Sequence, residues 1–271
     1  MPKIIDCFIF YNEIDLLTYR LNILNDIVDY FVIVEATHTH AGKEKPSYYN
    51  ENKHLFEKFN DKIINIIVDD FPYKTPHTID NVWKNENHQR NAISRGIDQL
   101  ANLNKLNDED YIIISDLDEI PDPVTLTKII NGEIVVEGGS ILSYDLYYYN
   151  LNTKFTFGWG AAKLIRYKYY KDENKTCQEI RNTYFPEIKK AGWHLSYFGD
   201  KYHIQNKIQN FAHQELNVPN FTDLDKIEYR VKNGLDLYDR PSESKQLVNI
   251  KIEDNDFLPY QYDKYLTKYY T

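Results

Sequence analysis

Two apolar runs separated by a helical repeat constrain the fold of this chain more than any other feature of its sequence. Residues 4–10 suit a buried strand, and the apolar residues that follow repeat at helical spacing as Ile14, Leu17, Leu21 and Leu24. A second apolar run, residues 30–34, ends on Glu35. Because a strand–helix–strand unit favours parallel pairing, we expect these segments to begin a doubly wound α/β sheet.

The alternation of strand and helix patterns continues along the chain. Further strands are predicted at residues 63–68, 111–115, 141–146 and 161–167, and helices at 80–103 and from 122 onward. An aromatic, histidine-bearing loop is expected at 192–199 and an amphipathic segment at 224–237. Beyond residue 217 the composition becomes polar and charged. We therefore expect one α/β domain over residues 1–216 and a C-terminal extension, residues 217–271, packed on the same domain.

Charge and cysteine content argue against several classes of protein. The 271 residues include 32 Lys and Arg against 41 Asp and Glu, a net charge of −9, whereas a nucleic-acid-binding protein needs a cationic face. Cys7 and Cys177 are the only cysteines, too few for a disulfide framework or a cysteine metal site. The start of the chain lacks a signal-peptide pattern, and no run approaches the roughly 20 apolar residues of a membrane helix. We expect a soluble, cytoplasmic protein with no nucleic-acid partner and no membrane span.

The densest chemical signal is the acidic segment Ser115–Pro121, which directly follows an apolar run. Ligands of open α/β sheets bind outside the carboxyl ends of the strands, where Asp116 and Asp118 are expected to lie. Carboxylate oxygens suit Mg²⁺ or Mn²⁺, and an ion bound there could hold a diphosphate. The alternative is a solvated acidic turn in which Asp116 caps the next helix, because acidic pairs are common in a chain with 41 carboxylates.

Basic and imidazole side chains elsewhere could complete such a site. Glu86 and Arg90 share a helix face with Trp83, and the guanidinium of Arg90 matches the geometry of a phosphate. His194 could add a nitrogen ligand to Mn²⁺, and Lys207 could neutralise a leaving diphosphate. The alternatives are a surface pair of Arg90 with Glu86, and a histidine that only fills the core or the surface.

Aromatic residues make up 15% of the chain. Most of these rings must be core, because large aromatic side chains supply much of any core's buried area. Trp159 and Trp193 are the two that we expect to pack on the apolar face of a sugar.

Several segments, taken in order, resemble glycosyltransferase family 17, the family of the bisecting β-1,4-N-acetylglucosaminyltransferase of N-glycans. The resemblance covers about the first four fifths of the chain. It is carried by Asp6-Cys7-Phe8, Asn12-Glu13, Arg20-Leu21, Val28 to Glu35, Gly42-Lys43, Lys45-Pro46, Trp83, Glu86, Gln89 to Ala92, Ser115 to Pro121, Gly192 to Tyr197 and Phe211 to Glu215.

The resemblance implies a nucleotide-sugar transferase of the GT-A type, with a Rossmann-like, mixed and mostly parallel sheet flanked by helices. By that analogy Asp116 and Asp118 form an Asp-x-Asp motif that binds Mn²⁺ (or Mg²⁺) and a UDP-sugar, most often UDP-GlcNAc. The analogy also implies that Asn12 and Glu35 lie where strand ends approach the nucleoside, and that Arg90 faces the phosphates.

The same analogy assigns roles to residues of the later segments. His194 is assigned as the additional metal ligand because Lys207 follows its His-x-Ser-Tyr-x-Gly segment, with His213 as the alternative. The family inverts the anomeric carbon, so we expect a single displacement. The ion and cationic side chains would stabilise the charge on the departing UDP.

We expect a carboxylate to take the proton of the acceptor hydroxyl in such a reaction. Glu215 and Asp145 are the candidates, and Glu179 is not excluded. Residues 36–49 form a polar loop after a strand end and are a candidate mobile lid. The acceptor, a polysaccharide, glycolipid or glycoprotein glycan, and the oligomeric state stay open.

Two other classes of protein would account for the same residues. A sugar- or nucleotide-binding module without turnover would bind UDP or a glycan and form no product. A metal-dependent phosphohydrolase would use the same carboxylates to release phosphate without a glycan acceptor.

Overall fold

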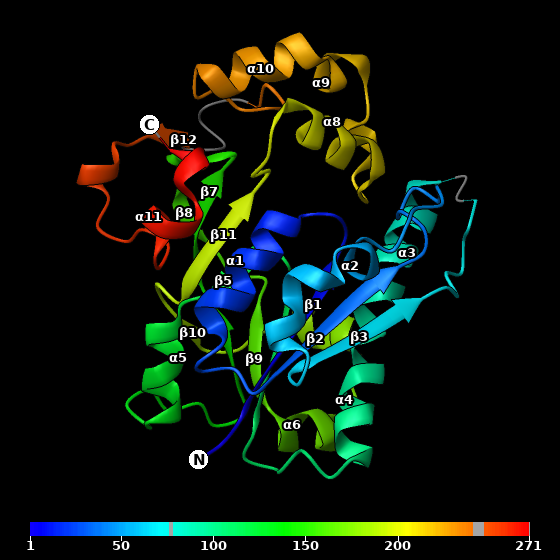
Figure 1. Cartoon of the computed structure of the whole chain (residues 1–271), viewed down its shortest axis with the longest axis vertical. Coiled ribbons are helices and arrows are strands. Elements are labelled where there is room, and N and C mark those ends of the chain that lie inside the picture. The colour runs from blue at the N-terminus through cyan, green and yellow to red at the C-terminus, as the bar shows by residue number, and fades with distance from the viewer. Residues whose placement is uncertain (76–77, 241–246, 271) are drawn as a thin grey trace.

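Four of the predicted strands pair in parallel, and Figure 1 shows three of them, β1, β2 and β3, side by side. The computed structural model describes residues 1–75, 78–240 and 247–270. It orders β3 (Ile63–Val68), β2 (Tyr30–Ala36), β1 (Ile4–Phe10) and β4 (Tyr111–Asp116) as neighbours. Phe10 of β1 is in register with Glu35, and Ile9 with Asp116, so the carboxyl ends of these strands form one edge.

Two mixed sheets make up the described part of the fold. The first sheet continues past β4 with β9 (Lys163–Arg166), β6 (Gly139–Leu142) and β10 (Glu187–Ile188), of which β9 is antiparallel to both its neighbours. The second has the order β12 (Leu247–Asn249), β8 (Asn150–Trp159), β7 (Tyr144–Tyr148), β11 (Gly192–Ser196) and β5 (Glu119–Pro121). The predicted α/β class, with a mixed and mostly parallel central sheet flanked by helices, is confirmed.

Helices cover both faces of the central sheet, which explains the unbroken apolar runs. Ile4 and Phe8 of β1 belong to a core cluster shared with α1 (Ile14–Leu24). Ile5 and Cys7 belong to a second cluster shared with α4 (Ile93–Asn102), which follows α3 (Ile79–Asn91). Alternate residues of one strand therefore supply two cores.

Shorter helices connect and cap the sheets. They are α2 (Tyr48–Glu51), α5 (Pro123–Ile130), α6 (Tyr167–Glu173), α7 (Cys177–Asn182), α8 (Lys201–Asn210), α9 (Pro219–Thr222), α10 (Leu224–Lys232) and α11 (Tyr262–Tyr265), with 3₁₀ turns η1 (Lys53–Phe59), η2 (Gln214–Leu216), η3 (Ile252–Asp254) and η4 (Thr267–Tyr269). The predicted start of α5 is confirmed, because Asp122 accepts hydrogen bonds from the amides of Val124 and Thr125. In the described residues no helix has the length and apolarity needed to cross a bilayer.

The C-terminal segment contacts both the second sheet and the main core. β12 pairs with β8, and Leu266 and Tyr269 are buried in the cluster that contains Phe8. Residues 241–246 and 271 of the predicted extension lie outside the described residues. The division at residue 216 stays a prediction.

The segment predicted as a loop at 192–199 is largely a strand, and this expectation was wrong. β11 lies between β7 and β5, so its backbone is paired on both sides. Gly192 has φ +152°, and a Cβ there would lie 2.2 Å from the carbonyl oxygen of Ile120. Only glycine lets β11 start so close to β5.

Two further boundaries differ from the predicted ones. The predicted strand 141–146 is divided at Ser143 between β6 and β7, which belong to different sheets, and the predicted helix 80–103 is divided at Ala92 between α3 and α4. Glu13 occupies the N-cap position of α1, and the side chain of Asn12 donates to Asn206.

Candidate active site

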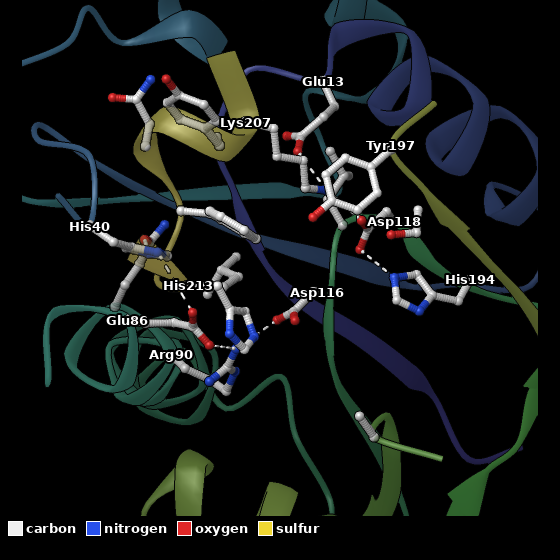
Figure 2. A pocket seen from close by; sticks show the side chains of 18 of the residues that line it. Glu13, His40, Glu86, Arg90, Asp116, Asp118, His194, Tyr197, Lys207 and His213 are labelled. Atoms are coloured by element: carbon white, nitrogen blue, oxygen red, sulfur yellow. Dashed lines mark hydrogen bonds and ion pairs between the residues drawn. The ribbon is translucent and has the colours of Figure 1, made fainter. Parts of the chain in front are cut away.

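A cavity of about 790 Å³ opens at the carboxyl ends of β1 and β4, where the central sheet meets the second sheet. Its wall includes residues from β1, α3, β8, β11 and α8 as well as the acidic turn after β4. Figure 2 shows Asp116 and Asp118 in this cavity, with cationic and imidazole side chains beside them. The predicted position of the motif outside the strand ends therefore agrees with the geometry.

A buried arginine binds the backbone of the acidic turn. Arg20 of α1 and Asp6 of β1 are fully buried, and their closest nitrogen and oxygen are 2.6 Å apart. The guanidinium also donates to the carbonyl oxygens of residues 116, 117 and 119 and to the hydroxyl of Ser115. All five donors of Arg20 are directed at this turn and at Asp6, so the backbone of the motif is fixed before any ligand binds.

The carboxylate of Asp116 lies between two arginines. Arg90 of α3 is 3.0 Å from Oδ1, and Arg181 of α7 is 2.9 Å from Oδ2. Burial alone would raise the pKa of Asp116, but Arg181 and Arg90 outweigh it and hold the pKa below its ordinary value. Arg90 also pairs with Glu86 of its own helix at 2.9 Å. The predicted Arg90–Glu86 pair and the predicted position of Arg90 at the motif therefore occur together.

Asp118 lies between a lysine and a histidine. Lys207 of α8 is 2.7 Å from Oδ2, and Nε2 of His194 is 3.5 Å from Oδ1. Burial opposes ionisation of Asp118, but Lys207 and then His194 hold its pKa well below the ordinary value. The pKa of Lys207 is raised, because Asp118 and Glu13 outweigh the effect of its burial. Both groups are therefore charged at neutral pH.

His194 is directed at Asp118 by the alternation of β11. Its neighbours Trp193 and Leu195 are buried in the main core, whereas His194 lines the cavity. The ring of His194 packs on Trp159 of β8 with ring centroids 4.8 Å apart. Trp159 in turn donates from Nε1 to Glu119. Trp159 therefore lines the cavity as predicted, whereas Trp193 donates to a backbone carbonyl and is not among the described residues of the cavity wall.

The donor set formed by Asp118 and His194 fits a divalent cation. The 3.5 Å between Oδ1 and Nε2 is long for a hydrogen bond and short enough for both atoms to bind one ion. Carboxylate and imidazole are both suitable ligands for Mn²⁺. Across residues 1–75, 78–240 and 247–270, no group of three or more His, Cys, Asp and Glu side chains is placed to hold a metal. The protein would thus supply two ligands and leave the remaining positions to phosphate and water.

Glu35 and Asn12 lie at strand ends, as predicted, but their side chains are not among the described residues that line this cavity. Glu35 is fully buried and accepts from Lys45, Ser47 and the amide of Tyr48. It thus fixes the end of the predicted lid and directs Lys45 toward the cavity wall. The mobility of residues 36–49 stays a prediction.

The predicted catalytic carboxylates lie apart from one another. Asp145 of β7 pairs with Lys154 at 2.8 Å and is not among the described residues of the cavity wall. Glu179 is exposed and closes the capping box of α7 with Thr176. Glu215 is also outside the wall, but its carboxylate is 2.6 Å from Nδ1 of His213, which does line the cavity.

Sequence reasoning missed charged and imidazole residues of the cavity wall, among them Arg181, Glu13 and His40. Arg181 lies on α7, a helix of six residues with no amphipathic repeat, so no sequence signal placed it at Asp116. Glu13, 3.7 Å from Lys207, follows β1 and could have been found by the strand-end rule that located Asp116. His40 lies on the predicted lid and contacts Glu86 at 3.7 Å.

Comparison with known proteins identifies the family to which this site belongs. The model of glycosyltransferase family 17 matches residues 1–251. The chain belongs to glycosyltransferase family 17. The protein is therefore a glycosyltransferase, and the resemblance predicted from the ordered segments is confirmed.

Curated relatives of this family 17 protein include two mammalian enzymes named β-1,4-mannosyl-glycoprotein 4-β-N-acetylglucosaminyltransferase. That of Rattus norvegicus is 31% identical over 134 residues, and that of Homo sapiens 32% over 125 residues. The matches cover 48% and 45% of this chain but only 24% and 22% of the relatives. The aligned region is thus about a quarter of their length.

Comparison with solved structures finds 4-diphosphocytidyl-2C-methyl-D-erythritol synthase from Anaerococcus prevotii. The alignment covers 79% of this chain and 99% of that protein's chain, at 9% identity and a TM-score of 0.39.

Proposed function

We propose that this glycosyltransferase has the GT-A type of site and moves GlcNAc from UDP-GlcNAc to a hydroxyl of a glycan acceptor, with inversion of the anomeric carbon. The observation that carries the proposal is the cavity at the strand ends, in which Asp118 faces both His194 and Lys207. Breaking the bond between a sugar and a diphosphate needs groups that stabilise the departing negative charge. The names of the relatives support GlcNAc as the sugar and a mannosyl glycan as the acceptor.

The cations of the cavity are the proposed diphosphate site. Arg90, Arg181 and Lys207 all line the cavity, and each is held by a carboxylate of the acidic motif. Arginine and lysine both bind phosphate oxygens, and arginine does so with two parallel hydrogen bonds. Because their positions are fixed by ion pairs, little reorganisation is needed when charge develops on the leaving UDP.

Asp118 and His194 are the proposed holders of a divalent ion, Mn²⁺ or Mg²⁺. Such an ion, when bound, supplies Lewis-acid stabilisation of the diphosphate. Asp116 is the other acidic residue of the motif, and its carboxylate lies between two arginines. Asp116 and Asp118 thus have different neighbours, and we propose different roles for them: Asp118 holds the ion, and Asp116 positions the arginines.

The donor's nucleoside and sugar are proposed to lie on either side of the motif. Tyr11 and Lys45 line the cavity at the ends of β1 and the predicted lid, near the predicted nucleoside residues Asn12 and Glu35. Trp159 lines it on the side of the second sheet and offers an aromatic face to a sugar. Glu215 and Asp145 stay the predicted bases; Glu215 contacts His213 of the cavity wall, whereas Asp145 pairs with Lys154.

A transfer assay tests the proposal. UDP-GlcNAc, UDP-glucose and GDP-mannose are each incubated with the protein, a biantennary N-glycan peptide and Mn²⁺, and products are identified by mass spectrometry. We expect one added GlcNAc, loss of product with EDTA, and a β-linkage by NMR. Asp118→Asn should abolish product, while Asp61→Asn, an exposed residue outside the cavity, should not. Release of phosphate alone indicates a phosphohydrolase, and binding without product from any donor indicates a module without turnover.

A further inference from the structure

The carboxylates that line the cavity are all engaged by cations. Among the described residues these are Glu13 with Lys207, Glu86 with Arg90, Asp116 with Arg90 and Arg181, and Asp118 with Lys207 and His194. A neighbouring cation favours the ionised form of a carboxylate and so makes it a weaker proton acceptor. Among the described residues of the wall, each carboxylate thus already has a cationic partner, which directs the search for the proton acceptor to other groups.

Four histidines line the cavity among the described residues, and three of them contact side chains other than a candidate base partner. His40 contacts Gln89 through Nε2 and Glu86 through Nδ1. His38 contacts Thr37 through Nδ1 and lies near Glu44 through Nε2. His194 faces Asp118. Figure 2 shows His213 in the same cavity, on a segment that follows α8.

His213 has the arrangement of an oriented general base. Its Nδ1 lies 2.6 Å from Oε1 of Glu215, and no other polar partner is present for the ring among the described residues. A carboxylate on Nδ1 favours the tautomer with its proton on that nitrogen and leaves the lone pair of Nε2 free. The ring is held against Trp83 at 4.6 Å and Phe211 at 5.4 Å between centroids. Both aromatic rings also line the cavity.

The position of His213 suits a group that meets the acceptor rather than the donor. Its side chain is 47% exposed, whereas that of Asp118 is 10% exposed. A glycan acceptor enters from solvent, so its hydroxyl reaches the donor sugar from the open side of the cavity. A base at the exposed side is therefore better placed than the buried carboxylates of the motif.

We infer that His213 is the catalytic base of the transfer reaction and that Glu215 is its positioning residue. This inference rests on the proposed function. The acceptor oxygen forms a bond to the anomeric carbon while the bond from that carbon to the diphosphate oxygen breaks. The electron pair of the broken bond leaves with UDP, and the hydroxyl proton moves to Nε2 of His213. Glu215 accepts the hydrogen bond from Nδ1 and stabilises the imidazolium that results.

The test compares His213→Ala with the wild type and with His54→Ala, an exposed histidine outside the cavity. We expect the kcat of transfer by His213→Ala to fall by about 10²- to 10⁴-fold, the usual contribution of a general base. Mn²⁺-dependent binding of UDP-GlcNAc, measured by calorimetry, should be unchanged, and added imidazole should restore part of the turnover. His54→Ala should match the wild type.

The outcomes separate this inference from the proposed function. If the wild type transfers no sugar from any donor, both fail. If the wild type transfers sugar and His213→Ala does so equally well, only the assignment of the base fails. Loss of Mn²⁺-dependent donor binding in His213→Ala also overturns it, because that result identifies His213 as a metal ligand instead.

The role of Glu215 is tested in two backgrounds. Glu215→Gln should lower kcat with little change in KM for either substrate. In the His213→Ala background the same substitution should have no further effect, because a positioning residue acts only through the group that it positions. An equal loss of kcat in both backgrounds would show that Glu215 acts independently of His213.

Discussion

Replacing Arg20 by methionine should destabilise the protein strongly, because this arginine connects the first strand to the acidic turn. Arg20 and Asp6 are both fully buried and form two hydrogen bonds of 2.8 and 2.6 Å. One nitrogen, Nη1, donates to three backbone carbonyls of the turn, and Nη2 donates to Ser115. Methionine replaces the aliphatic stem of the arginine but offers none of these donors.

The expected loss follows from the groups left without partners. Removing one member of a buried ion pair costs about 3–5 kcal/mol, because the remaining charge is uncompensated. Each buried carbonyl that loses its donor adds about 1 kcal/mol or more. We therefore expect Arg20→Met to lose more than about 4 kcal/mol, a large part of the roughly 5–15 kcal/mol that stabilises most domains. Arg20→Lys keeps the charge but not the fork of donors, and should lose about 2 kcal/mol.

Urea unfolding at pH 7, followed by circular dichroism, measures these losses. Arg95→Met is the matched control, because Arg95 pairs with Asp70 at 2.7 Å while both side chains are exposed. An exposed pair contributes about 1 kcal/mol or less. If Arg20→Met is too unstable to purify, Arg20→Lys carries the comparison. Equal losses at positions 20 and 95 would refute the reasoning that burial sets the cost.

Three further predictions concern the site and the core. Arg181→Gln should weaken UDP-GlcNAc binding about 10- to 100-fold in calorimetry, the equivalent of one or two charge-assisted hydrogen bonds, and unchanged affinity would remove Arg181 from the diphosphate site. Trp159→Phe should raise the KM of the donor, whereas Trp193→Phe should lower the urea midpoint and leave that KM unchanged. A raised KM in Trp193→Phe, with an unchanged KM in Trp159→Phe, would contradict these positions. Burial raises the pKa of the Cys177 thiol to about 12 and also that of Cys7, so iodoacetamide at pH 8 should modify neither thiol in the native protein and both in urea, as counted by mass spectrometry.

The central sheet and the position of the acidic motif could be predicted because they depend on local patterns. Strands buried on both faces are mostly apolar, and the runs that became β1, β2 and β4 are of this kind, whereas β3 lies at the edge of the sheet and is only partly buried. A polar segment directly after such a strand must lie at its carboxyl end. The inferred parallel sheet therefore places Asp116 and Asp118 at the carboxyl ends of its strands.

Other parts of the site depend on contacts that no local pattern contains. Arg181 reaches Asp116 across 65 positions of sequence from a short, charged helix. Glu35 lies at the carboxyl end of a strand as Asp116 does, but its carboxylate turns back into the following loop, where it accepts from backbone amides and pairs with Lys45. Whether a strand-end carboxylate faces the ligand or its own loop is decided by the loop's conformation.

The segment around His194 contains a sequence pattern that indicates a strand, although a loop was predicted there. The segment alternates buried and cavity-facing residues, with Trp193 and Leu195 in the core and His194 in the cavity. Period-two alternation would have predicted a strand, assigned Trp193 to the core and brought His194 to the site. Flanking glycines and the mixture of aromatic and polar residues favoured the loop instead.

Calorimetric binding of UDP-GlcNAc, with and without Mn²⁺, tests the central claim most directly. The wild type should bind the donor in a Mn²⁺-dependent manner, and Asp118→Asn should lose that dependence, because Asp118 faces both His194 and Lys207. Asp61→Asn, outside the cavity, should bind as the wild type does. Donor binding that is equally tight without Mn²⁺, or unchanged in Asp118→Asn, would contradict a metal-assisted nucleotide-sugar site at this motif.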